Sequence, residues 1–308
     1  MKGVAEAPSK AIITGEHFVV HGAWALAAAL PRRVRVEVEP SPRFRVSSDK
    51  FSGSSPALRP IGRVIDAMGK EFSIKPRVKV SVASAVPEGA GLGSSAATMV
   101  AAASAFSRLH GLGLGVNEIV KFAMVGERDV HGNPSGIDPN ICAHGGVLMF
   151  RTGHQPRRVH LKWPSSLIVA YSGRQRSTKG QIGKVALTKE ERPDLFNMLT
   201  DSIGWLSESA ADMLVQGDGP GLGRLLTLNH VVLRSMGVSN DTLDEMVDAL
   251  CSLGCHGAKL TGAGGGGSVV AVAPEAKEKS IVSGLTARGF ETFRARIPAE
   301  GVKSWLER

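Results

Sequence analysis

The strongest chemical signal in the sequence is the glycine-rich segment PEGAGLGSSAA at residues 87–97. It follows the alternating, strand-like residues 78–82 and opens the alanine-rich residues 94–109, whose composition favours a helix. Glycine lacks the side chain that would keep an anion away from backbone N–H groups, and a helix start adds further unpaired N–H groups. The segment therefore predicts a phosphate-binding loop, and its simpler interpretation is a glycine turn with a serine at the helix N-cap. It is neither a P-loop nor the dinucleotide fingerprint, because it lacks the lysine of the first and the glycine spacing of the second.

A second glycine-rich segment, KLTGAGGGGS, occupies residues 259–268. Consecutive glycines cost conformational entropy, whereas a structural hairpin turn needs only one or two of them. The excess favours a backbone that must approach a ligand closely. A flexible connection between two strands explains the same run equally well.

Two carboxylates and one lysine complete the set of candidate catalytic groups. Glu127 lies late in a helix predicted over residues 117–129, and Asp138 lies in a loop predicted over residues 131–139, which is rich in glycine and proline. Lys10 precedes an apolar run near the N-terminus. Each of these charges alone is typical of a solvated surface. Together with two candidate phosphate loops, they supply the metal ligand and the base that phosphoryl transfer requires.

The elements that must position these groups indicate a mixed fold. Strand patterns dominate the first third of the chain, and helical spacing dominates residues 195–253. This segregation predicts an α+β fold, because a regular parallel sheet would alternate strands with helices. We also expect short strands on both sides of the second glycine run and a last strand over residues 290–297.

A polar, irregular stretch near residues 151–163 predicts a domain boundary. It would separate an N-terminal unit of residues 1–155, which contains the first glycine-rich segment, from a C-terminal unit of residues 156–308.

Composition narrows the class of protein. The chain has 308 residues, 43% of them hydrophobic and 21% charged, which is typical of a globular protein with a full core. Its formal net charge is +9, but the basic residues are scattered and only 5% of residues are aromatic, so we expect no nucleic-acid partner. The apolar runs are too short to span a bilayer, and the three cysteines lack zinc-like spacing. We therefore expect a cytoplasmic protein with free thiols and no membrane partner.

Taken together, these segments resemble the GHMP kinases, a family of ATP-dependent small-molecule kinases. Residues Ala7–Lys10 are similar to the first family motif, residues 87–97 to the second and residues 259–268 to the third, in the same order along the chain. Ser9 stands where the family usually has glycine, and Ser268 stands where members that act on mevalonate often have cysteine. The resemblance implies a two-lobed fold, with a ribosomal-protein-like α/β lobe followed by a ferredoxin-like lobe and the reaction in the cleft between them.

The resemblance also implies roles for individual residues. Asp138 would be the catalytic base, Lys10 would stabilise charge on the acceptor hydroxyl, and Ser95 and Glu127 would hold Mg²⁺. The loop that would wrap the phosphates of ATP consists of Pro87, Glu88, Gly89, Ala90, Gly91, Leu92, Gly93, Ser94 and Ser95. The residues implied for the acceptor pocket are Glu16, His17, Thr178 and Ala263.

Within the family, the acceptor is indicated by two short segments. GEHFVVHG at residues 15–22 and HGNPSGID at residues 131–138 are similar to segments of the members that phosphorylate mevalonate. The resemblance thus implies mevalonate as the small-molecule partner, and a homodimer as an assembly common in the family. Two alternatives stay open: another family acceptor, such as phosphomevalonate, a different position of mevalonate or a sugar, and a non-catalytic binding protein on the same fold.

Overall fold

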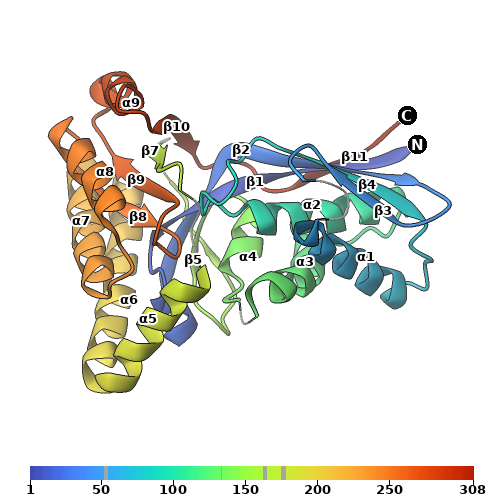
Figure 1. Ribbon diagram of the computed structural model, residues 1–308, viewed down its shortest axis with the longest axis horizontal. Helices are drawn as coiled ribbons and strands as arrows, with labels where there is room; N and C mark the ends of the chain where they lie inside the picture. The colour runs from blue at the N-terminus through green and yellow to red at the C-terminus, as the bar shows by residue number, and fades with distance from the viewer. Residues whose placement is uncertain (52–54, 133, 162–164, 175–177) are drawn as a thin grey trace.

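The computed structural model describes residues 1–51, 55–132, 134–161, 165–174 and 178–308, which form two sheets with helices packed against them (Figure 1). A seven-stranded sheet lies towards the end of the molecule where both chain termini meet, and a four-stranded sheet lies towards the other end. This arrangement confirms the predicted α+β fold.

The first sheet is built around one long antiparallel pair, β1 (Lys2–Thr14) and β2 (Ala25–Pro40). The turn between them contains the short 3-10 helix η1 (Phe18–His21). The strand order is β11-β1-β2-β4-β3, with β5 and β6 continuing from β2, and only the β3–β4 pair is parallel among these pairings. The remaining strands are β3 (Arg45–Ser48), β4 (Val78–Ser84), β5 (Val147–Phe150), β6 (Arg157–Arg158) and β11 (Lys303–Glu307).

Helices cover one face of this sheet (Figure 1). They are α1 (Arg59–Glu71), preceded by the 3-10 helix η2 (Pro56–Leu58), α2 (Ser94–Leu109), α3 (Val116–His131) and α4 (Ile137–His144). The alanine-rich α2 packs against β1 and β2 and also against the three neighbouring helices. Its small side chains allow this close approach on every side, and the predicted central, buried helix is therefore confirmed.

The second sheet is antiparallel, with the order β10-β7-β9-β8. Its strands are β7 (Ser165–Tyr171), β8 (Gly257–Thr261), β9 (Ser268–Val272) and β10 (Glu291–Ile297). The helices that accompany it are α5 (Thr178–Glu191), α6 (Pro193–Gln216), α7 (Gly219–Ser235), α8 (Asp241–Ser252) and α9 (Glu278–Thr286), with the 3-10 helix η3 (Glu275–Lys277) before α9. The strand order and the chain order, strand, helices, strand, strand, helix, strand, are those of a ferredoxin-like unit. None of the helices in the described ranges is long and apolar enough to cross a membrane.

Several elements differ from the sequence-based expectation. The loop expected over residues 131–139 ends earlier, because α4 begins at Ile137 and tolerates Pro139 in its first turn. The strand over residues 291–297 is not the last, since β11 follows it. β1 was not anticipated, because it is buried on both faces along most of its length and so shows no alternation of polar and apolar residues.

The C-terminus returns to the first sheet. β11 pairs with β1, with Lys2 opposite Glu307 and Glu6 opposite Lys303. Residues of both sheets, for example Leu30 and Val270, also belong to one continuous hydrophobic core. The proposed division near residue 155 stays a prediction. It assigns β11 to the C-terminal unit, although β11 pairs with β1 in the first sheet.

Candidate active site

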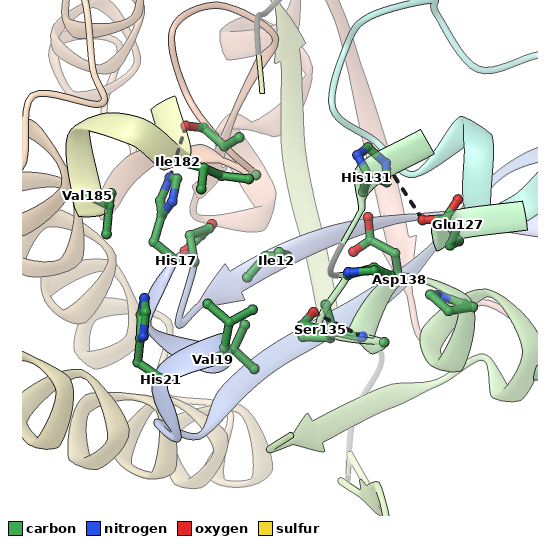
Figure 2. Close-up of a pocket in the computed structure, with 18 of the residues that line it drawn as sticks. Ile12, His17, Val19, His21, Glu127, His131, Ser135, Asp138, Ile182 and Val185 are labelled. Carbon is green, nitrogen blue, oxygen red and sulfur yellow. Dashed lines mark hydrogen bonds and ion pairs between the residues drawn. The ribbon is translucent and has the colours of Figure 1, made fainter. Parts of the chain in front are cut away.

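A cavity of about 390 Å³ opens between the two halves of the molecule. Figure 2 shows Glu127, His131 and Asp138 along one side of it and His17 and His21 along the other. The walls come from β1, the turn that holds η1, the end of α3, the start of α4, one face of α5 and the second glycine run. Segments far apart in the sequence therefore meet around one space.

An ion pair between Lys10 and Asp138 lies in this cavity. Lys10 is 1% exposed on the inner part of β1, and its Nζ lies 3.1 Å from Oδ1 of Asp138. Asp138 is in the first turn of α4, which follows Gly136 in a left-handed conformation with φ 91°. The helix start places the carboxylate at the positive end of the helix dipole. One buried cation and one partly exposed carboxylate thus face the same space.

The first glycine segment is fixed directly against this lysine. The backbone N–H of Lys10 donates to the carbonyl of Leu92 at 2.9 Å. Gly93 has φ 74°, and a Cβ at this position would lie 2.6 Å from Cγ of Lys10. Glycine is thus required at residue 93 both by the backbone conformation and by the packing of the lysine stem.

A hydrogen bond links the start of α2 to the end of α3. The Ser95 hydroxyl donates to Oε1 of Glu127 at 2.6 Å, and Nε2 of His131 lies 3.7 Å from Oε2 of the same carboxylate. Burial raises the pKa of Glu127 to about 7; the Ser95 hydrogen bond opposes this shift, and the nearby charge of Asp138 adds to it. The carboxylate is therefore held between two side chains in a site where its charge is costly without a cation.

A second cavity, of about 360 Å³, lies on the other side of this hydrogen bond. Its polar wall includes Glu88, Gly89, Ser94 and Ser95, and its apolar wall is formed by side chains that include Leu58, Ile61 and Met99. Because Ser95 lines the second cavity and Glu127 the first, the two cavities adjoin at their hydrogen bond. A long ligand with an apolar ring at one end and an anionic chain fits such a pair of spaces.

The far wall of the first cavity is held by contacts between the turn that follows β1 and the second glycine-rich segment, residues 259–268. The Nε2 of His17 donates to the carbonyl of Ala263 at 3.0 Å, and Glu16 forms a buried ion pair with Lys259. Burial raises the pKa of Glu16 and lowers that of Lys259, and their mutual attraction opposes both shifts. Within the described residues, Oε2 of Glu16 is buried without a hydrogen-bond partner. A buried acceptor of this kind at a cavity wall favours a ligand that donates a hydrogen bond.

The expected Mg²⁺ site has only two candidate protein ligands, Ser95 and Glu127. Within the described ranges, no cluster of three or more His, Cys, Asp or Glu side chains could hold a metal ion by itself. The Ser95 hydroxyl and the Glu127 carboxylate are oxygen donors, the type that Mg²⁺ prefers, and Mg²⁺ commonly takes one or two protein ligands beside substrate phosphates. The residues present therefore fit Mg²⁺ bound together with a nucleotide.

Comparison with protein families agrees with this geometry. Residues 59–146 match the GHMP kinases N terminal domain, and residues 210–291 match the GHMP kinases C terminal domain. The chain belongs to the GHMP kinase family. Like other kinases of this family, it uses ATP as the phosphate donor.

Relatives within the family cover nearly the whole chain. A mevalonate kinase of Thermococcus sibiricus is 34% identical over 98% of this chain and 98% of its own, and one of Methanothermobacter thermautotrophicus is 33% identical over 98% and 100%. Among solved structures, L. major mevalonate kinase in complex with R-mevalonate matches with a TM-score of 0.84 and 29% identity, covering 96% of each chain.

Most of the predicted site residues of this GHMP kinase come together. The first cavity is lined by Lys10, Glu16, His17, Glu127, Asp138 and Ala263. The second is lined by Glu88, Gly89, Ser94 and Ser95. The rest of the loop, Pro87 and residues 90–93, lines neither of these two cavities, and residues 90–93 are buried. The side chain of Thr178, like residues 176 and 177, lies outside the described residues.

Other functional candidates were missed by sequence reasoning. Lys259 opens the second glycine segment, but its burial beside Glu16 depends on a pairing across 243 positions. Ser268 and Tyr171 reach the phosphate loop from the second sheet, and only Ser268 stood out in the sequence, as a departure from the family pattern.

Proposed function

We propose that this protein transfers the γ-phosphoryl group of ATP to the primary hydroxyl of mevalonate, giving phosphomevalonate for isoprenoid biosynthesis. The observation that carries the proposal is the Lys10–Asp138 pair, in a cavity that adjoins the Ser95–Glu127 hydrogen bond. The mevalonate kinases that match this chain over nearly its whole length at about a third identity support the choice of acceptor.

The proposed step is a displacement at phosphorus. The acceptor oxygen forms a bond to the γ-phosphorus, the bond from this phosphorus to the β,γ-bridging oxygen breaks, and ADP leaves. Asp138 takes the proton of the acceptor hydroxyl, and the Lys10 ammonium stabilises the negative charge that develops on that oxygen. The burial of Lys10 against Gly93 fixes its position, which matters because phosphoryl transfer depends on alignment and charge neutralisation.

The nucleotide would span both cavities. The base would lie against the apolar wall that includes Leu58 and Ile61, and the phosphates would lie along the glycine loop and the first turn of α2. Ser95 and Glu127 would hold Mg²⁺, which when bound neutralises charge on the β- and γ-phosphates.

The acceptor wall suits a short, branched hydroxy acid. Ile12, Val19, Ile182 and Val185 supply apolar surface for methyl and methylene groups, as Figure 2 shows. Glu16 supplies the buried acceptor that a second hydroxyl on the substrate would satisfy. A homodimeric state and a cytoplasmic location remain predictions from the sequence.

An acceptor panel tests this proposal. Purified protein with ATP and Mg²⁺ should release ADP with mevalonate and not with phosphomevalonate or galactose, and ³¹P NMR should show a phosphate monoester on the primary alcohol. ADP release with another alcohol and not with mevalonate would contradict the acceptor. Salt-dependent retention of RNA without any ATP turnover would instead support the non-catalytic alternative.

A further inference from the structure

We propose that Ser268 and Tyr171, two residues of the second sheet, act as positioning residues that orient the peptide groups of the phosphate loop. This inference rests on the proposed function, because it takes residues 87–95 as the site of the nucleotide phosphates.

The two residues form one cross-strand pair. Tyr171 at the end of β7 lies directly opposite Ser268 at the start of β9. The Ser268 hydroxyl, which is fully buried, donates to the carbonyl of Ala90 at 2.9 Å. The Tyr171 hydroxyl donates to the carbonyl of Glu88 at 2.9 Å. One cross-strand pair of the second sheet therefore binds the carbonyls of Glu88 and Ala90, in the loop that follows β4 of the first sheet.

A third contact continues the same alternation. The carbonyl of Leu92 accepts from the backbone N–H of Lys10 at 2.9 Å. The carbonyls of residues 88, 90 and 92 are thus all bound, and the residues after them are Gly89, Gly91 and Gly93, with φ values of 67°, 78° and 74°. Every second residue is therefore a glycine in the left-handed region.

The geometry of the peptide bond turns this pattern into a consequence for ligand binding. In a trans peptide the C=O of one residue and the N–H of the next point in opposite directions. Fixing the carbonyls of Glu88 and Ala90 towards the second sheet therefore directs the N–H groups of Gly89 and Gly91 away from it. Among the described residues, neither N–H has a hydrogen-bond partner. Successive backbone N–H groups in turns of this kind can form the concave nests that bind anions.

The identity of Ser268 matters for the strength of this contact. A thiol is a weak hydrogen-bond donor, so a cysteine here would hold the carbonyl of Ala90 less firmly than the serine of this chain does. Ser268→Cys should therefore weaken this contact without removing it.

The test measures nucleotide affinity by isothermal titration calorimetry on the full-length protein. The variants are Ser268→Ala, Ser268→Cys, Tyr171→Phe and the double variant Ser268→Ala/Tyr171→Phe. Thr292→Val is the matched control, because it removes a hydroxyl from β10 of the same sheet, where Thr292 contacts Phe290 and not the loop. The ligands are ATP with Mg²⁺, and adenosine, which occupies the base site without phosphates.

We expect Kd for ATP to rise about fivefold in each alanine or phenylalanine single variant and about twentyfold in the double variant, as the loss of one or two hydrogen bonds implies. Ser268→Cys should lie between wild type and Ser268→Ala. Affinity for adenosine, and all properties of Thr292→Val, should match wild type.

Equal ATP affinity in the double variant and the wild type, with only a lower thermal midpoint, would show that the hydroxyls merely stabilise the fold and would overturn the inference. An equal loss of affinity for ATP and for adenosine would also overturn the inference, because the variants would then weaken binding of the nucleoside and not of the phosphates. If Ser268→Ala does not fold, Tyr171→Phe alone decides. Failure of the wild type itself to bind ATP would instead contradict the proposed function.

Discussion

The two glycine-rich segments have similar composition but different physical roles. In residues 87–93, alternate glycines lie in the left-handed region between carbonyls that the rest of the protein binds, and the segment ends at the start of a long helix. In residues 262–267, all five glycines have positive φ. There, a Cβ on Gly264 would lie 2.1 Å from the carbonyl of Val238, and one on Gly265 would lie 2.3 Å from the side-chain amide of Gln181.

This difference shows that a glycine run is explained by what surrounds it. Among the residues that the structure describes, the N–H groups of Gly89 and Gly91 in the first segment have no hydrogen-bond partner, and they lie close to the positive end of a helix, which suits an anion. The second is a tightly packed joint between β8 and β9 whose Ala263 carbonyl receives a hydrogen bond from His17 at the cavity wall. The second run is therefore neither a plain hairpin turn nor a loose connection, and three predictions separate the two roles.

Of these three predictions, Gly93→Ala should have the largest effect. Its Cβ would displace the Lys10 stem, and a misplacement of about 1 Å at a catalytic group costs about a hundredfold in rate. Steady-state kinetics with saturating ATP and acceptor should show this loss in kcat. Gly113→Ala is the matched control, since Gly113 also has a positive φ of 65° and an added Cβ would meet no atom of the described residues within 4 Å, so this variant should lose stability without losing kcat. Equal kcat values in both variants would contradict a specific link between Gly93 and Lys10.

The next effect concerns the charge of Glu127, whose carboxylate accepts a hydrogen bond from Ser95 at the end of the first segment. Because the pKa of Glu127 is raised from 4.5 to about 7, its ionisation destabilises the unliganded fold above pH 7, and this cost is absent below about pH 4.5. Glu127→Gln should therefore raise the free energy of unfolding by up to about 3 kcal/mol at pH 8 and leave it nearly unchanged at pH 4.5. Urea unfolding at the two pH values, without nucleotide or metal, measures this difference. A stabilisation that does not change with pH would argue against a buried, costly carboxylate.

The smallest of the three effects is expected in the second segment. Gly264→Ala should lower the free energy of unfolding by about 2 kcal/mol, from the left-handed backbone and from overpacking against Val238. The folded fraction should keep its affinity for ATP, and the loss should be the same at pH 5 and pH 8. A weakened ATP affinity with unchanged stability would mean that the second run contacts the nucleotide, as we propose for the first.

Sequence reasoning reached the features that local chemistry determines. The Ala-rich helix α2, the glycine loop before it and the place of Glu127 late in α3 follow from propensity and from conformational constraints on neighbouring residues. Asp138 was expected in a loop and instead lies in the first turn of α4. The structure places Lys10 and Asp138 3.1 Å apart, as the resemblance to the family implied, and their catalytic roles remain proposals.

What sequence reasoning missed depends on long-range packing. Strand β1 has no alternating pattern because both its faces are buried. Strand β11 joins the first sheet only through its pairing with β1. The Glu16–Lys259 ion pair and the cross-strand pair of Tyr171 and Ser268 join residues that only the tertiary fold brings together. No local pattern distinguishes a buried lysine such as Lys259 from a solvated one.

The central claim is that Asp138 accepts the acceptor proton beside Lys10, and Asp138→Asn tests it most directly. This substitution keeps the size of the side chain and removes the base. Single-turnover measurements with ATP, Mg²⁺ and mevalonate should show the rate of phosphoryl transfer falling about a thousandfold, with ATP affinity unchanged. Transfer at the wild-type rate by a folded Asp138→Asn protein would contradict the account.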